Sequence, residues 1–169
     1  MSGCTQLSIA VKQIKFARTY MLGMIADIDD TLWFVQPSGV TTHIAWQVGH
    51  LAMAQYGLTM LRIRGKEPED AEFISPDFFR LFQKGTQPQA DPAAYPSPAE
   101  IREVLAAVHQ HALGELEHYT DNELEVKLPE PHAVFDTKLG SLFFCSAHEL
   151  IHIGQIGLLR RLLGKPPLR

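Results

Sequence analysis

Cysteine is scarce in this sequence: Cys4 and Cys145 are the only two, too few for a disulfide framework. Lysine and arginine form no basic run. The net charge of −4 and the pI near 6.0 argue against nucleic acid as the main partner. No apolar run approaches the roughly 20 residues that a membrane-spanning helix needs. These deficits argue against a disulfide-rich secreted scaffold, a nucleic-acid-binding protein and an integral membrane protein.

The beginning of the sequence does not resemble an export signal. Lys12 and Lys15 interrupt its apolar pattern, which is not typical of a signal peptide. The few cysteines also suit a reducing compartment. We therefore expect a cytoplasmic protein without a membrane partner.

Apolar residues recur at helical spacing in four long segments, and no segment reads convincingly as a strand. The segments expected to be helical are about 5–29, 43–64, 98–119 and 141–164. The third follows a capping box from Ser97 to Glu100, and the fourth ends at Gly164, before two prolines. This pattern predicts an all-α fold: one four-helix-bundle domain over residues 1–169, with one long crossover connection.

The crossover is the proline-rich segment 66–98 between the second and third helices. A short helix from Asp77 to Phe82 is expected after Ser75 and Pro76, with its phenylalanines anchoring the segment to the bundle. A structureless loop of this length would be unusual in a compact domain, and loops of this kind often cover sites. The segment is therefore expected to be an ordered surface excursion.

The last helix carries a pair of histidines at metal-ligand spacing. His148 and His152 are four residues apart, so they share one helix face and can converge on one ion. With Glu149 they match the zincin motif, in which the glutamate is a general base. The extended motif fails, however, because Gln155 and Leu158 stand where a glycine and a third histidine are required, and no acidic residue follows Glu149.

A third ligand must therefore come from upstream, and His50 is the natural candidate. It lies on a largely apolar stripe of the second helix, and bundle cores are where such ligands converge. Three histidines and a water form a known open zinc site, and the same set suits nickel. The alternative is that His50, His148 and His152 are core histidines satisfied by ordinary hydrogen bonds.

Together these residues resemble the DinB-like family of metal-binding four-helix bundles. The resemblance rests on two motifs: Trp46-x-x-Gly49-His50-Leu51, and His148-Glu149-x-x-His152-x-Gly154-Gln155-Ile156 followed by Leu-Arg-Arg-x-x-Gly. It covers about residues 6–164. It implies an up-down-down-up bundle, the metal triad His50, His148 and His152, and a place for Gln155 in the wall or surroundings of the site. It says nothing of the 66–98 excursion.

Relatives in that family include S-transferases and isomerases that use thiols such as bacillithiol, mycothiol or glutathione. The resemblance therefore implies a thiol-dependent S-transferase acting on small electrophilic molecules, and it supports a homodimer. The catalytic candidates are Gln155, from the family motif, and Glu149, from the His-Glu-x-x-His motif, and the histidine set favours a zinc or nickel ion. Two alternatives stay open: a metal-dependent hydrolase with Glu149 as base, and a non-catalytic, stress-associated metal-binding protein. A cationic pocket would favour the transferase, and its candidate residues are Arg62, Arg64, Lys66, Arg80 and Lys84.

Overall fold

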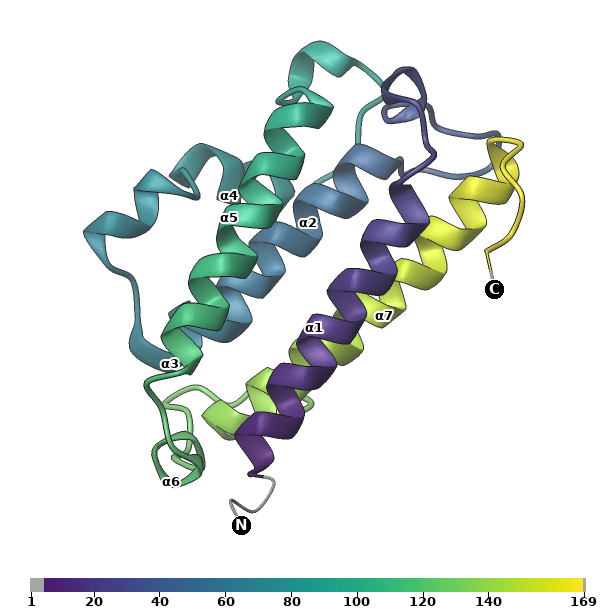
Figure 1. The fold of residues 1–169 in the computed structure, drawn as a ribbon. Helices are drawn as coiled ribbons and strands as arrows, with labels where there is room; N and C mark the ends of the chain where they lie inside the picture. Colours follow the sequence, from purple (N-terminus) through teal and green to yellow (C-terminus); the bar gives the residue numbers. More distant parts are fainter. Residues whose placement is uncertain (1–4, 169) are drawn as a thin grey trace.

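The computed structural model describes residues 5–168, in which four long helices lie side by side (Figure 1). These are α1 (Gln6–Ile25), α2 (Ile44–Tyr56), α5 (Pro98–Leu116) and α7 (Lys138–Leu162). The expected all-α class is confirmed: the described residues contain no strand, only an isolated bridge between Lys127 and Thr137. The shorter elements are η1 (Asp30–Leu32) and α6 (Asp121–Leu124).

The long helices pair as α1 with α7 and α2 with α5. Within each pair the two helices run parallel to each other (Figure 1). α2 and α7 run in opposite directions. Gln47 near the start of α2 bonds to His152 on α7, whereas Leu58, just beyond the end of α2, bonds to Ser141 near the start of α7. This arrangement brings the middle of α2 to the histidine pair of α7.

Local sequence explains the helix boundaries. Ser97 and Glu100 form the expected capping box at the start of α5, and the cap of α1 is Thr5. At the start of α2 the cap is His43, whose Nδ1 accepts a hydrogen bond from the Trp46 amide at 3.1 Å. His43 is thus a helix-start residue, buried and away from the histidine pair.

The second helix contains an irregular turn that its apolar pattern did not predict. α2 continues directly into a π-helical turn, η2 (Gly57–Leu61), and then into a last α-helical turn, α3 (Arg62–Arg64). Two backbone carbonyl groups in or beside this turn accept hydrogen bonds from hydroxyl groups. Ser141 Oγ donates to Leu58 O, and Thr59 Oγ1 donates to Gln55 O, both at 2.7 Å. Single π-helical turns inside α-helices occur frequently at functional sites.

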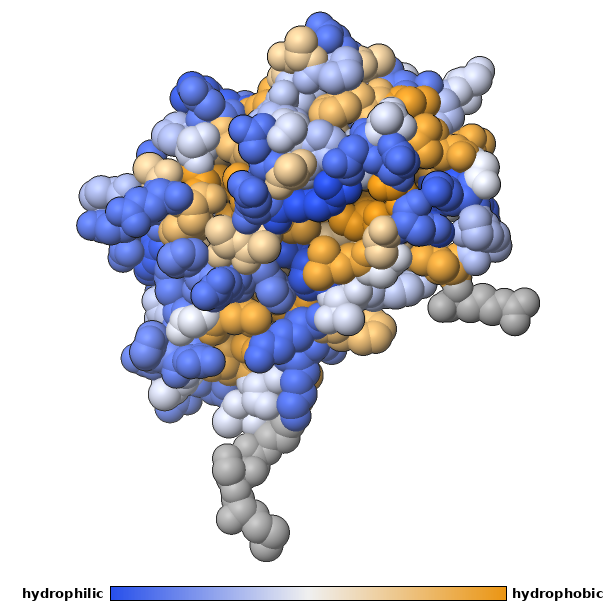
Figure 2. All heavy atoms as spheres, turned by 45° about the horizontal axis from the view of Figure 1, so that its top comes forward, coloured by the Kyte–Doolittle hydropathy of each residue, from blue (hydrophilic) through white to orange (hydrophobic). Residues whose placement is uncertain are grey.

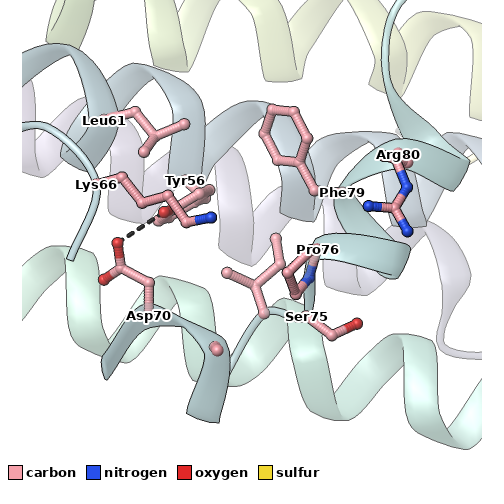
Figure 3. Close-up of a pocket in the computed structure, with 10 residues that line it drawn as sticks. Tyr56, Leu61, Lys66, Asp70, Ser75, Pro76, Phe79 and Arg80 are labelled. Atoms are coloured by element: carbon pink, nitrogen blue, oxygen red, sulfur yellow. Dashed lines mark hydrogen bonds between the residues drawn. The ribbon is translucent and has the colours of Figure 1, made fainter. Parts of the chain in front are cut away.

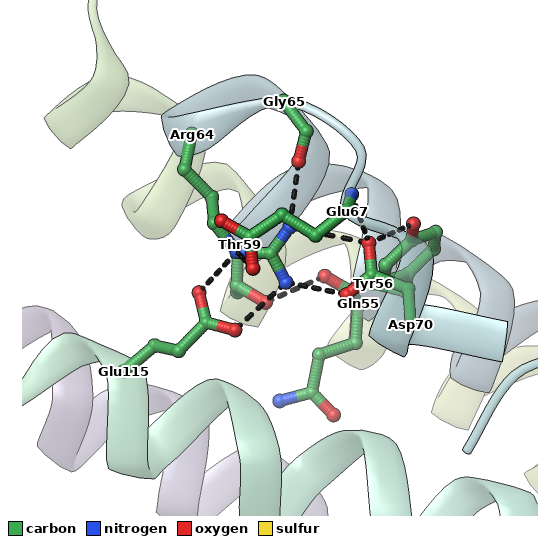
Figure 4. Close-up of polar contacts among 8 residues, drawn as sticks. All are labelled: Gln55, Tyr56, Thr59, Arg64, Gly65, Glu67, Asp70 and Glu115. Carbon is green, nitrogen blue, oxygen red and sulfur yellow. Dashed lines mark hydrogen bonds and ion pairs between the residues drawn. The ribbon is translucent and has the colours of Figure 1, made fainter. Parts of the chain in front are cut away.

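The 66–98 excursion contains three short helices and is held near its start and in its middle. It contains η3 (Pro68–Glu72), α4 (Pro76–Phe82) and η4 (Pro92–Ala94). At its start, the Arg64 guanidinium binds Asp70 at 2.6 Å and Glu115 of α5 at 2.8 Å (Figure 4). Farther along, Phe78 and Phe82 of α4 are buried in the main hydrophobic cluster, as the sequence predicted.

Polar and apolar residues are interspersed on the molecular face shown in Figure 2. One helix of the described residues, α7, is long and apolar enough to cross a membrane, by length and composition. The search of the sequence for a long uninterrupted apolar run did not identify this helix. In its most apolar window, 44% of the residues are buried inside the protein. Core helices of globular proteins share this composition, and α7 packs against α1 and α2 along its length.

Candidate metal centre

The structure brings together the three histidines that the sequence singled out. His50 comes from α2, and His148 and His152 come from consecutive turns of α7. One ring nitrogen of each lies within 4.8 Å of those of the other two. The ring centroids are 4.7 Å apart for His50 and His152 and 4.6 Å apart for His148 and His152. Three imidazoles from two helices therefore face one small volume.

Hydrogen bonds orient two of the rings so that Nε2 remains free. Nδ1 of His50 lies 2.8 Å from the carbonyl oxygen of Phe82, and Nδ1 of His152 lies 2.6 Å from Oε1 of Gln47. Both partners are acceptors, so each Nδ1 carries the proton and each Nε2 presents a lone pair. Metal-ligating histidines in proteins are held in this way by partners of their second nitrogen.

The surroundings favour neutral imidazoles. Burial is the largest cause that lowers the pKa of His148 to about 4 and of His152 to about 3, followed by the charge of neighbouring histidines. Burial also lowers the pKa of His50. A neutral imidazole is the form that binds a divalent ion. The donor set, its convergence and its outer hydrogen bonds thus fit a divalent metal ion that imidazole nitrogens can bind.

A close approach between α2 and α4 places the acceptor for His50. A Cβ atom at Gly49 would lie 2.4 Å from the ring of Phe82, so only glycine lets that ring pack there. The Phe82 carbonyl then lies beside His50. On its other side, His50 stacks on Trp46 at a centroid distance of 4.8 Å, and the Trp46 indole N–H donates to Thr86 Oγ1 at 3.0 Å. Segment 66–98 therefore supplies part of the site wall.

The triad opens into a cavity of about 670 Å³. Its lining residues are Trp46, His50, Met53, Ala54, Gly57, Leu58, Leu61, Arg62, Phe79, Lys84, Gly85, His132, Phe144, His148 and His152. Most of these side chains are apolar, and none is a carboxylate. A pocket of this size with a few polar groups is typical of small-molecule sites.

Three cationic or ionisable groups line this cavity beside the triad. Arg62 follows the π-helical turn, Lys84 follows α4, and His132 lies in the segment between α6 and α7. After burial, the positive charges of Arg62 and Lys84 are the causes that lower the pKa of His132. Two of the five expected cationic candidates thus reach the cavity. Of the others, Arg64 is bound by Asp70 and Glu115, and Arg80 by Asp77.

Glu149 is oriented differently from a general base at the triad. Its carboxylate receives a hydrogen bond from Nε of Arg18 at 2.7 Å, and both side chains are buried. It does not line the cavity. The reason is geometric: adjacent residues on an α-helix point about 100° apart, so Glu149 turns away from the face that carries His148 and His152. Arg18 also binds Gln55 Oε1 at 2.8 Å, which ties α1 and α7 to α2.

Gln155 does not contact the triad directly but is linked to His152 through Gln47. Its side chain is exposed and is not among the cavity-lining residues; its Oε1 accepts a hydrogen bond from Nε2 of Gln47 at 2.9 Å.

Gln47, whose Oε1 accepts from His152, was not singled out by sequence, since nothing in a helical pattern distinguishes one buried glutamine. His132 was also missed, because it lies in an irregular segment without periodicity. His109 of α5 is half-buried, and its Nδ1 lies 3.0 Å from Nε2 of Gln55.

Comparisons with known proteins bear on the fold and the family of this chain. A search among curated proteins found no match. Among solved structures, one described as the conserved protein of a locus from Enterococcus faecalis superposes with a TM-score of 0.72 at 14% sequence identity, covering 98% of this chain and 99% of that one. At this identity the likeness shows a shared fold. A sequence profile described as the DinB superfamily matches residues 13–156, a range that includes all three histidines. The chain therefore belongs to the DinB superfamily.

Proposed function

We propose that this protein is a metal-dependent transferase that joins a low-molecular-weight anionic thiol to a small electrophilic molecule. The observation that carries the proposal is the charge pattern of the cavity. Arg62, Lys84 and His132 line it beside the triad, and no carboxylate does so within the described residues. Such a cavity attracts a cosubstrate that carries carboxylates, and charge-assisted hydrogen bonds would hold it there.

The chemistry assigned to the site is the formation of a sulfur–carbon bond. A divalent ion bound by neutral imidazoles keeps its charge and lowers the pKa of a thiol that binds to it. In the overall reaction the thiol proton passes to solvent, the sulfur bonds to the electrophilic carbon, and the bond from that carbon to its leaving group breaks. The protein contributes orientation: Arg62 and Lys84 bind the carboxylates, and His132 offers a hydrogen-bond donor.

The donor role of His132 follows from its backbone contacts. Its Nδ1 accepts a hydrogen bond from the Val134 amide at 3.2 Å, so in the neutral ring the proton is on Nε2. The ring stacks on Phe135 at a centroid distance of 4.6 Å, and the Arg62 guanidinium lies 5.5 Å from the centroid of the same ring. Phe135 thus holds both groups at the cavity.

In this proposal Gln155 is a positioning residue that acts through Gln47 on His152. Glu149 supports the packing of α7 through Arg18. A hydrolase would instead need a base beside the metal, and the paired, buried carboxylate of Glu149 is the observation that ranks this alternative second. A non-catalytic protein with a structural ion would have no use for the cationic cavity.

The remaining parts of the proposal are a homodimer, cytoplasmic location and no membrane or nucleic-acid partner.

The test uses cobalt-substituted protein and two thiols that differ in charge. Mercaptosuccinate carries two carboxylates, whereas 2-mercaptoethanol carries none. We expect a sulfur-to-metal charge-transfer band with both, and at lower concentration with mercaptosuccinate. Arg62→Gln and Lys84→Gln should each weaken mercaptosuccinate binding about fivefold, as expected for loss of a partly exposed ion pair, and leave 2-mercaptoethanol unchanged. Arg161→Gln, at an exposed position of α7 outside the cavity, is the matched control.

Activity is then measured with a generic electrophile and the better thiol. Gln155→Ala should lower turnover with metal retained, whereas His152→Ala should lose both. The transferase proposal is overturned if no thiol perturbs the cobalt spectrum. A hydrolase would be indicated by turnover without thiol that Glu149→Gln abolishes while the metal stays bound.

A further inference from the structure

A second cavity, of about 210 Å³, lies beside the metal cavity. Figure 3 shows the residues that line it. It is enclosed by the second helix on one side and by η3 and α4 of the excursion on the other. Its lining residues are Tyr56, Leu61, Lys66, Asp70, Ala71, Ile74, Ser75, Pro76, Phe79 and Arg80. Leu61 and Phe79 line both cavities, so these two side chains form the wall between them.

The two flanks of the cavity are held by separate anchors. η3 is held by Asp70, whose carboxylate is 2.6 Å from the Arg64 guanidinium and 2.6 Å from the Tyr56 hydroxyl (Figure 4). α4 is held by the buried rings of Phe78 and Phe82. Asp70 and Tyr56 form part of the cavity lining, whereas Phe78 and Phe82 do not, and the space between η3 and α4 stays unfilled.

The interior of the cavity is apolar, and the one carboxylate in its lining, Asp70, is already paired with Arg64. Leu61, Ile74, Pro76 and Phe79 contribute aliphatic and aromatic surface. The Tyr56 hydroxyl donates to Asp70, and Arg64 balances the charge of that carboxylate, so neither group is left to attract a polar ligand. Apolar cavities of roughly 150 Å³ bind benzene, so this space can accept one aromatic ring with a short chain.

Lys66 is the cationic residue at this cavity that is available to bind an anionic ligand. Lys66 is exposed and forms no ion pair within residues 5–168, whereas Arg80 is already paired with Asp77. Lys66 lines the cavity, and in the view of Figure 3 its side chain overlaps that of Tyr56. An apolar slot beside an unpaired ammonium group is complementary to a molecule with an apolar body and one anionic end.

We propose that this second cavity binds a small monocarboxylic acid with a single aromatic ring, the ring between Tyr56, Ile74 and Phe79 and the carboxylate on Lys66. The proposal does not depend on the transferase assignment, because none of these groups belongs to the metal triad. It predicts that binding requires the ring, that the charge strengthens it, and that binding persists when the metal is removed.

The probe for this site is 3-phenylpropanoate, added to the metal-loaded full chain with labelled methyl groups. Its ring protons should give intermolecular nuclear Overhauser effects to the Ile74 methyl groups. Met53 lines only the metal cavity, so its methyl group should give none. The neutral analogue 3-phenylpropanol should bind more weakly, and propanoate should not bind measurably.

Two lysine variants separate the two cavities. Lys66→Gln should weaken 3-phenylpropanoate two- to fivefold, the range for an exposed ion pair, and leave 3-phenylpropanol unchanged. Lys84→Gln, which removes a charge from the metal cavity, should change neither. The proposal is overturned if 3-phenylpropanoate does not bind at millimolar concentration, if its ring contacts Met53 instead of Ile74, or if binding is lost with the metal or with Lys84→Gln.

Discussion

Oε1 of Gln47 lies 2.6 Å from Nδ1 of His152, across the interface between α2 and α7. The amide group of the same glutamine donates to Thr42 Oγ1 at 3.0 Å and to Gln155 Oε1 at 2.9 Å. These two donations fix which end of the amide faces the histidine. Gln47 therefore sets the orientation of one metal-ligand candidate and links it to the surface.

Gln47→Leu should weaken metal binding about 10- to 100-fold while all three histidines remain, because partners of ligating histidines have effects of this size. Competition with a chromophoric chelator measures the affinity. Gln155→Ala removes only the outer bond and serves as the control, with a smaller effect expected. Equal affinity of the Gln47→Leu variant and the unmodified protein would show that the His152 ring is held by packing alone.

His148→Ala should leave a two-ligand site and remove most of the bound metal, measured by elemental analysis of the purified protein. His118→Ala is the control, since His118 is exposed near the end of α5 and lies outside the triad. Both variants should keep their helical circular dichroism, because the apolar stripes fold the bundle without the ion. Similar metal content in the two variants would refute the assignment of His148.

Stability should fall as the pH is lowered through the titration of His109. Burial, followed by the positive charges of Arg18 and Lys15, lowers its pKa from 6.5 to about 4. The unfolded chain then binds the proton more strongly, so this contribution is complete above pH 6.5 and is lost as the pH falls toward 4. Because the side chain is partly exposed, screening reduces the effect to about 1–2 kcal/mol.

Urea unfolding between about pH 7 and pH 4.5 measures this effect. His109→Gln keeps a partner for Gln55 but does not titrate, so its stability should decline less steeply. His118→Gln, at an exposed position, should decline as the unmodified protein does. Parallel curves for His109→Gln and the unmodified protein would contradict the expectation.

The proposed homodimer should have about twice the chain mass of 18.9 kDa by light scattering at micromolar concentration. The face of α7 that carries Leu150, Ile151 and Leu158 is the candidate contact, because these side chains are 42%, 57% and 47% exposed. Leu158→Glu should then give a monomer. Val134→Glu, at another exposed apolar position, should not. A single chain mass for the unmodified protein would exclude the dimer.

The sequence predicted the parts of this protein that depend on repeated local patterns. Apolar residues at helical spacing determine one face of each long helix, and the Ser97 box determines where α5 begins. The histidines were predicted because helix spacing pairs His148 with His152, and because only His50 combined an inward face with a suitable place in the chain.

What sequence did not predict depends on contacts between distant segments. Glu149 follows a ligand candidate directly, yet its direction is set by Arg18 on another helix. Gln47 became recognisable only once α2 and α7 were placed together. The second cavity lies between segments that Asp70 and Phe78 anchor separately, which no local pattern records.

The π-helical turn shifts the phase of the second helix between His50 and Arg62. These residues are twelve positions apart, and a regular α-helix would point them about 120° away from each other. One residue absorbed in the wider turn reduces the difference to about 20°, so both side chains reach the same cavity. Removing a single residue from this turn would leave a regular helix with eleven positions between the two side chains, which again differ by about 20°. The guanidinium would therefore still face the cavity, and the π-helical turn is what lets the helix carry one more residue without losing this alignment.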